Sequence, residues 1–219
     1  MKKHLIFRAL FLCLPLLCNA QQSVTIGDVF CQMPKTMFPY LTNNNKLDLV
    51  DFIKSGMKSE VVNEFDDTTK LVKMTDDYIL LEASKSLTVE MKLLPADQSA
   101  YDTLSTILCV SCSYSEVPAA SNVNFYSTNW IPLDIDDPIS NYRERIIQRP
   151  DTMDVEQYSL ICETQHPVMI VARLSESNMT LTLQGKPHIM SATDDKKEQI
   201  ESIYRQISLK WNGKTFKEN

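Results

Sequence analysis

Apolar and polar residues alternate along several short segments of the chain. In the clearest case, residues 87–93, four apolar residues alternate with three polar ones: Leu87, Val89, Met91 and Leu93, separated by Thr88, Glu90 and Lys92. Successive side chains of a β-strand point to opposite faces of its sheet. The pattern therefore predicts a strand with one buried face and one solvated face.

Other segments extend this pattern into antiparallel hairpins. Residues 78–83 precede the clear strand, and the polar turn 84–86 separates the two segments. Further strands are expected over residues 108–114 and from Val123 to near Trp130. A second hairpin is predicted from the apolar run 168–174 and the alternating residues 179–183, and a last short strand from Leu209 up to Phe216.

Helical spacing of apolar residues is found in only a few short stretches. Residues 46–55 predict an amphipathic helix with Asn45 as its N-cap, and a helical stretch is expected around residues 139–147. Thr193 is expected to cap a third helix, with Ile200, Ile203 and Ile207 on its apolar face. The predicted fold class is α+β, mainly antiparallel sheet with short flanking helices.

Residues 83–95 and 174–187 share a serine-rich turn, an alternating strand and a closing proline. Residues 21–219 are predicted to form a single α+β domain, in which two hairpins share a common pattern. The alternative is two related helix-plus-sheet lobes, over residues 24–132 and 133–219.

The first twenty residues have the layout of an export signal. Basic residues occupy three of the first eight positions, and an apolar run follows from Ala9 to Leu17. Residues 1–20 are predicted to be a signal peptide cleaved after Ala20. Lipoprotein processing at Cys18 is the alternative, and the bulky Leu17 argues against it. No later run reaches the roughly 18 apolar residues of a membrane span, so no transmembrane segment is expected in the mature chain.

Removal of residues 1–20 takes away three positive charges and no acidic residue, which changes the formal net charge from −6 to −9. Nucleic acid and anionic lipid both require clustered Lys and Arg. The acidic balance therefore argues against these partners, and in particular no nucleic-acid partner is expected.

Four cysteines follow the predicted signal: Cys31, Cys109, Cys112 and Cys162. An exported chain meets oxidising conditions, so one or two disulfides are conceivable, and the sequence does not choose among the three full pairings. Cys109 and Cys112 lie in one predicted strand, where residues three apart point to opposite faces and are about 10 Å apart. They are expected to be buried thiols and not a redox or zinc motif.

Only two histidines follow the predicted signal, His166 and His188, each beside a proline. A Cys162–His166 pair would share a helix face if residues 155–165 were helical, but no third group is evident to orient the histidine. We therefore expect no catalytic residues, no cofactor and no enzyme activity.

Acidic residues cluster in several predicted turns. Asp134, Asp136 and Asp137 are the best candidates for calcium ligands, but their loop lacks the glycine and the closing glutamate of an EF-hand. We expect these residues, and the aspartate pairs at 66–67 and 76–77, to be solvated residues in turns. No metal site is therefore predicted.

The aromatic residues Phe125, Tyr126 and Trp130 lie close together in sequence. Aromatic residues at strand ends bind sugars or peptides in some proteins, but they more often close a core. Core packing is the expected role here.

Four strings of the sequence carry a resemblance to a known family: MPKTMFPYLTNNNKLDLVDFIKSGMKSEVVNEF, MTDDYILLEAS, VEMKLLP and FYSTNW. Together they resemble an uncharacterised family of secreted Bacteroidales proteins, domain of unknown function 3256, from about residue 24 to the C-terminus. The resemblance implies a secreted or envelope location in a Gram-negative bacterium. It implies no activity, cofactor or site residue.

The function expected from these observations is that of a periplasmic or secreted, non-catalytic binding or interaction protein. Its partner is expected to be a protein or peptide, held on a sheet face or edge. The alternatives are a small-ligand protein that binds a lipid or glycan and, less favoured, a hydrolase.

Overall fold

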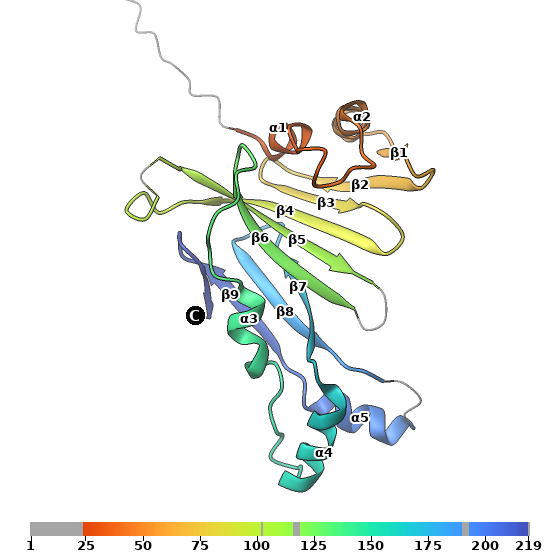
Figure 1. Ribbon diagram of the computed structural model, residues 1–219, viewed down its shortest axis with the longest axis vertical. Helices are drawn as coiled ribbons and strands as arrows, with labels where there is room; N and C mark the ends of the chain where they lie inside the picture. The colour runs from red at the N-terminus through yellow and green to blue at the C-terminus, as the bar shows by residue number, and fades with distance from the viewer. Residues whose placement is uncertain (1–23, 102, 116–118, 190–192, 219) are drawn as a thin grey trace, which may run out of the picture.

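The computed structural model describes residues 24–101, 103–115, 119–189 and 193–218. Within them, strands form two antiparallel sheets (Figure 1). The six-stranded sheet has the order β1-β2-β3-β4-β5-β6, and the four-stranded sheet has the order β10-β9-β8-β7. The predicted fold class, α+β with mainly antiparallel sheet and short helices, is confirmed.

The first sheet is a meander in which each strand pairs with the next one in the chain. Its strands are β1 (Glu60–Val62), β2 (Thr68–Met74), β3 (Tyr78–Glu82), β4 (Leu87–Pro95), β5 (Thr106–Tyr114) and β6 (Ala120–Ser127). The predicted hairpin is β3 and β4. Strands β1 and β2 were not predicted, because β1 is short and a register shift between Leu71 and Lys73 interrupts the alternation in β2.

The second sheet contains β7 (Met169–Leu174), β8 (Thr180–Lys186), β9 (Gln206–Trp211) and β10 (Phe216–Glu218). The second predicted hairpin is β7 and β8, with Leu174 paired to Leu181. The expected single strand from Leu209 to Phe216 is wrong in one respect. It is two strands, since the chain turns after Trp211 and Phe216 pairs back with that residue.

Short helices lie outside the sheets. They are α1 (Ile26–Cys31), α2 (Asn43–Lys54), α3 (Pro138–Tyr142) followed by the 3-10 turn η1 (Arg143–Arg145), α4 (Val155–Gln165) and α5 (Asp194–Ser202). In Figure 1, α1 and α2 lie beside the first sheet, and α4 and α5 lie at the far end of the second.

The N-cap predicted for α2 was displaced by one turn. Thr42 is the cap, and its hydroxyl accepts a hydrogen bond from the N–H of Asn45 at 3.0 Å. The Asn45 side chain accepts one from the N–H of Thr42 at 3.1 Å. Asn45 is therefore the third helical residue of a capping box.

Helix α5 begins after Thr193, as predicted, but its expected apolar face is wrong. Ile203 is the C-cap of α5, and Ile207 belongs to β9. Both side chains are buried. No residue of α5 itself is buried. The isoleucine spacing reflects a buried helix end and a following strand rather than a helix face.

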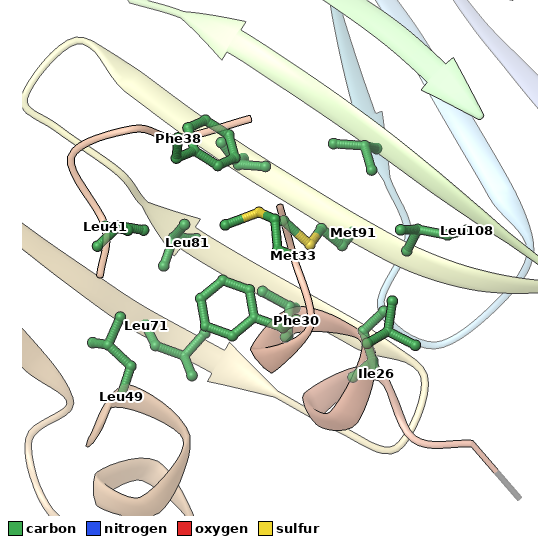
Figure 2. Close-up of a cluster of buried hydrophobic side chains, with 14 of the residues drawn as sticks. Ile26, Phe30, Met33, Phe38, Leu41, Leu49, Leu71, Leu81, Met91 and Leu108 are labelled. Carbon is green, nitrogen blue, oxygen red and sulfur yellow. The ribbon is translucent and has the colours of Figure 1, made fainter. Parts of the chain in front are cut away.

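The first core lies between α1, α2 and one face of the first sheet. Phe30 and Leu49 from the helices meet Leu71, Leu81 and neighbouring side chains of the strands, all 3% exposed or less (Figure 2). The two helices have 6 and 12 residues, and isolated helices this short are marginal in water. Burial against the sheet therefore supplies much of their stability.

The second core lies between the two sheets. Ile107 and Phe125 of the first sheet pack in one cluster with Ile170 and Leu183 of the second. The expected solvated face of β4 is therefore wrong, because the second sheet covers it.

Strands β1–β6 fall within residues 24–132 and β7–β10 within 133–219. Both sheets also contribute to the second core. The two related lobes and their duplication stay predictions. The signal peptide predicted over residues 1–20, with Cys18, lies outside the described residues. Among the helices that are described, none has the length and apolarity to cross a membrane.

Candidate functional site

Strand β7 is the edge strand of the second sheet, and it rests on polar side chains of the first sheet. The N–H of Ala172 donates a hydrogen bond to the Ser121 hydroxyl at 3.0 Å, and the Ser111 hydroxyl donates one to the Ala172 carbonyl at 2.9 Å. An edge strand carries unpaired backbone groups that are costly to bury without partners. The serines of β5 and β6 supply those partners.

The same edge continues onto two charged residues of β4. The N–H of Leu174 donates to Oε2 of Glu90 at 3.1 Å, and the Lys92 ammonium donates to the Glu176 carbonyl at 2.6 Å. Lys92 also pairs with Asp77 at 2.9 Å. Glu90 and Lys92 are only 5% and 2% exposed. Their burial is tolerated because each charge has defined partners.

Burial raises the pKa of the Glu90 carboxyl, and hydrogen bonds from Tyr78 and Leu174 and the nearby Arg173 oppose this effect. The Tyr78 hydroxyl donates to Oε1 of Glu90 at 2.9 Å, and burial raises the pKa of that hydroxyl, with Glu90 adding to the effect. Perturbed pKa values mark many catalytic sites, but structural networks perturb them as well. Both oxygens of Glu90 hold structural partners, so the cluster joins the sheets.

The other face of the second sheet is uncovered. Strands β8 and β9 alternate strictly, with Leu181, Leu183, Ile207 and Leu209 in the core. Their intervening side chains therefore point away from the core and are partly or fully exposed. In β7, Met169 and Val171 are level with Lys186 and Gln184 and share this face, where Val171 is only 4% exposed. We define the open face by the polar residues on this side: Arg173, Thr180, Thr182, Gln184, Lys186, Gln206, Ser208, Lys210 and Lys217.

The open face carries four positive charges and no acidic residue, on a chain with a formal net charge of −6. Arg173 lies near a carboxylate, with Nη1 3.9 Å from Oε2 of Glu90. Among the described residues, no ion pair involves Lys186, Lys210 or Lys217. The face is thus a local exception to the acidic character of the protein.

Two hollows adjoin the open face and share Gln184 and Lys186. One, the corner groove, has a volume of about 360 Å3 and lies between β7–β8 and the ends of β4 and β5, where Thr88 and Tyr114 line it. The other, of about 400 Å3, continues past Gln206 and is lined on its far side by Glu201, Tyr204 and Arg205. Together they hollow the open face along β8.

The end of β8 is fixed by a contact that requires glycine at position 185. A Cβ atom there would collide with the ring of Tyr204 and lie 2.5 Å from Cγ2 of Ile146. The Tyr204 hydroxyl donates to Oε1 of Gln165 at 3.0 Å, which also accepts from the N–H of His188 at 2.8 Å. Burial raises the pKa of Tyr204 to about 12. These contacts tie the C-terminus of α4 to the second sheet.

A Cys162–His166 pair would require both residues on one face of a helix. Residues 155–165 are indeed helical. The helix ends at Gln165, however, and His166 follows it with an extended backbone and an exposed side chain. The two residues therefore do not share a helix face. Burial is the main cause that raises the pKa of the Tyr158 and Tyr204 hydroxyls, and the nearby, partly buried Cys162 adds to the effect.

The candidate calcium ligands are spread along the segment that leads into α3. The Asp137 side chain caps that helix, accepting hydrogen bonds from the N–H groups of Ile139 and Ser140 at 3.0 and 3.2 Å. Asp134 and Asp136 are exposed. In the part of the chain that the structure describes, no three His, Cys, Asp or Glu residues are placed to hold a metal ion.

The two strand cysteines lie on opposite faces of β5, as predicted. Cys109 belongs to the core between the sheets and Cys112 packs against the helix-side core. Burial raises the pKa of both thiols, that of Cys112 to about 11. Cys31, Cys109, Cys112 and Cys162 are all free thiols.

The aromatic candidates pack into the cores, as expected. Phe125 stacks on Trp211 with ring centroids 5.8 Å apart in the core between the sheets. Trp130 closes the helix-side core, and its indole N–H donates to the Val29 carbonyl at 2.8 Å. Tyr126 is half-buried beside it.

The open face was not predicted as a site from the sequence. Its polar residues were seen only as the outer half of an alternating pattern. The available signal was that the outward positions of residues 180–186 and 206–210 hold Thr, Ser, Gln and Lys but no acid. Nothing in the sequence showed that this polar face stays open while that of β4 is covered.

Two packed antiparallel sheets, with helices on one of them and one open polar face, define the class of this α+β protein. The chain belongs to the family described as "Protein of unknown function (DUF3256)", whose model matches residues 18–216. A domain of an uncharacterized protein from Porphyromonas gingivalis W83 has a similar fold, with a TM-score of 0.64 and 20% sequence identity. The alignment covers 88% of this chain and 96% of that one. None of the curated proteins matches the sequence.

Proposed function

We propose that this protein is a non-catalytic binding module of the bacterial cell envelope, and that it holds a protein or peptide partner on the open face. The observation that carries the proposal is the uneven covering of the sheets. Near the sheet centres, the helices and the second sheet cover both faces of the first sheet. On the open face, exposed side chains are combined with two adjoining hollows.

The sheet edges support strand addition less well than the open face supports binding. The edge of β7 is occupied by Ser111, Ser121 and Glu90. The outer strands β1 and β10 have three residues each, and short edge strands discourage pairing with another chain. The remaining outer strand, β6, has eight residues, and backbone hydrogen bonds with Ile131 and Leu133 occupy the end of its outer edge.

The lining of the hollows favours a polar partner over a lipid. Pockets for small apolar ligands are concave and mostly apolar. The corner groove is lined by Arg173, Gln184, Lys186 and Thr88 among others. The location in the envelope is supported by the export-type pattern of residues 1–20.

Site-specific photocrosslinking in the native cells tests the proposal. A crosslinking amino acid replaces Gln184 on the open face, and the matched control replaces Lys70, an exposed residue of β2 on the first sheet. We expect a discrete adduct from position 184 that is absent from position 70. The partner, once purified, should bind the unmodified chain, and Gln184→Trp should weaken that binding while Lys70→Trp leaves it unchanged.

Adducts of equal yield at both positions would contradict the proposal. So would a purified partner that binds the Gln184→Trp chain as tightly as the original. Because both side chains are exposed, neither substitution is expected to disturb folding.

A further inference from the structure

The open face has a charge pattern that specifies the chemistry of its occupant. We infer that it binds an extended, acidic polypeptide segment, and this inference rests on the proposed function of that face. Its four cations, Arg173, Lys186, Lys210 and Lys217, have no acidic residue among them. Complementary charge at an interface favours a partner of opposite sign and disfavours partners of like sign.

The cations lie at three separate places on the face, which points to an extended ligand. Arg173 and Lys186 stand apart, and Lys210 and Lys217 are level with each other on neighbouring strands. Arg173 is level with Thr182 of β8, which is level with Ser208 of β9. With about 3.4 Å per residue and 4.8 Å between strands, the backbones of Arg173 and Lys210 are about 12 Å apart. Lys210 is level with Thr180, so it and Lys186 are about 20 Å apart along β8. A single phosphate or carboxylate cannot contact these cations together, but an extended peptide of about six residues spans the distance.

Uncharged hydrogen-bonding side chains fill the space between the cations. Thr182, Gln184, Gln206 and Ser208 form this central group. Hydroxyl and amide side chains both donate and accept hydrogen bonds, as do the backbone groups of a peptide. The face thus matches a ligand with separated negative charges and polar groups between them.

Polyanions of higher charge density fit this surface less well. Nucleic acids carry a charge at every phosphate and are bound by closely grouped Lys and Arg. Single-stranded nucleic acids also stack their bases on aromatic side chains, and the open face, which lies wholly within the described residues, has no aromatic residue. Tyr114 and Tyr204 line the two adjoining hollows, outside the open face itself.

Calorimetric titration of the chain from residue 21 onward tests the inference. The probes are three synthetic peptides of about eight residues that alternate Glu, Gln or Lys with Thr, long enough to span the cations. We expect the Glu–Thr peptide to bind, the Gln–Thr and Lys–Thr peptides not to bind, and binding to weaken as salt is added.

Two matched double variants locate the contact. Arg173→Gln with Lys210→Gln removes two charges from the open face, and Lys58→Gln with Lys70→Gln removes two from exposed positions near the opposite edge of the first sheet. The first pair should weaken the Glu–Thr peptide by about five- to tenfold, as expected for two partly exposed ion pairs. The second pair should change its affinity less than about twofold.

Three results would overturn the inference: no binding of the Glu–Thr peptide, equal weakening by both double variants, or tighter binding of heparin or single-stranded DNA at this face. An adduct at position 184 with a partner that needs no acidic residue would also overturn it, while the proposed function would stand. Failure of the crosslinking experiment combined with specific peptide binding would overturn only the proposal of a cellular partner and support the acidic-ligand chemistry.

Discussion

The backbone N–H of Leu174 donates a hydrogen bond to the carboxylate of Glu90 at 3.1 Å, across the junction of the two sheets. Leu174 ends the edge strand of the second sheet, and Glu90 lies in the middle of β4. Together with the hydrogen bond from Tyr78 and the ion pair with Arg173 at 3.9 Å, the contact explains how a glutamate in an alternating strand is buried. It also holds the β7 edge of the second sheet against the first sheet.

Glu90 is expected to make stability depend on pH. Burial raises its pKa above the ordinary value of 4.5, so the folded chain binds this proton more tightly than the unfolded chain. Its contribution to stability is therefore fully present below pH 4.5 and is lost as the pH rises through the folded pKa. Urea unfolding of Glu90→Gln should show a smaller decline in the free energy of unfolding over this range than the original chain.

The matched control is Glu82→Gln, at an exposed position on the neighbouring strand β3. A Glu82→Gln chain should follow the original pH profile. If Glu90→Gln and the original chain had parallel profiles above pH 4.5, the carboxyl would not have the raised pKa on which this prediction depends.

The serine contacts to β7 are expected to protect an edge strand from exchange with solvent. In Ser121→Ala the N–H of Ala172 loses its acceptor, so unfolding should become easier by about 1–3 kcal/mol. Hydrogen exchange at Ala172 should accelerate. Ser208→Ala, on the open face, removes a hydroxyl of the same size and should change stability by less than about 0.5 kcal/mol. Slow, unchanged exchange at Ala172 in Ser121→Ala would refute the contact.

The strands were predictable where alternation is regular, and the packing of the sheets was not. The alternation from Leu87 to Leu93 predicted β4 correctly, because a period of two indicates a strand whether or not other elements cover its faces. The same alternation placed Glu90 and Lys92 in solvent, since it cannot show that another sheet will lie over them. Their roles depend on Leu174 and Glu176, each 84 residues away in the chain.

Gly185 is expected to tolerate no side chain. In Gly185→Ala the added Cβ would collide with Tyr204 and Ile146, and overpacking of this kind costs about 1–3 kcal/mol. The control is Gly56→Ala, where nothing lies within 4 Å but φ is +68°, so the cost should be about 1–2 kcal/mol from the backbone alone.

Combination with Tyr204→Ala separates the two glycines. Removing the ring should recover part of the loss in Gly185→Ala and none of the loss in Gly56→Ala. Equal effects of Tyr204→Ala on both alanine variants, by thermal unfolding, would contradict the steric account.

The four cysteines are expected to remain thiols. Burial raises the pKa of Cys109 and Cys112, and the thiolate is the reactive form, so both should react slowly with iodoacetamide while the protein is folded. After unfolding without reductant, Cys31, Cys109, Cys112 and Cys162 should all be alkylated, as in a chain reduced beforehand. A mass that shows fewer modified cysteines than in the reduced control would reveal a disulfide.

The open face could not be predicted from the sequence, because its residues are brought together only by the pairing of strands. Thr182 of β8 and Ser208 of β9 are outward-facing polar residues, and neither belongs to a recognisable motif. They become neighbours because β8 pairs with β9, with α5 between them in the chain. Their site also depends on the first sheet, whose Tyr114 and Thr88 wall the corner groove.

The most direct measurement of the central claim is a map of amide chemical shifts in the 15N-labelled chain as the Glu–Thr peptide is added. The account predicts that the largest changes fall on Thr182, Gln184 and Ser208, with Val62 of β1 unaffected. Changes concentrated on β1, on α4 or on α5, with the open face silent, would contradict it.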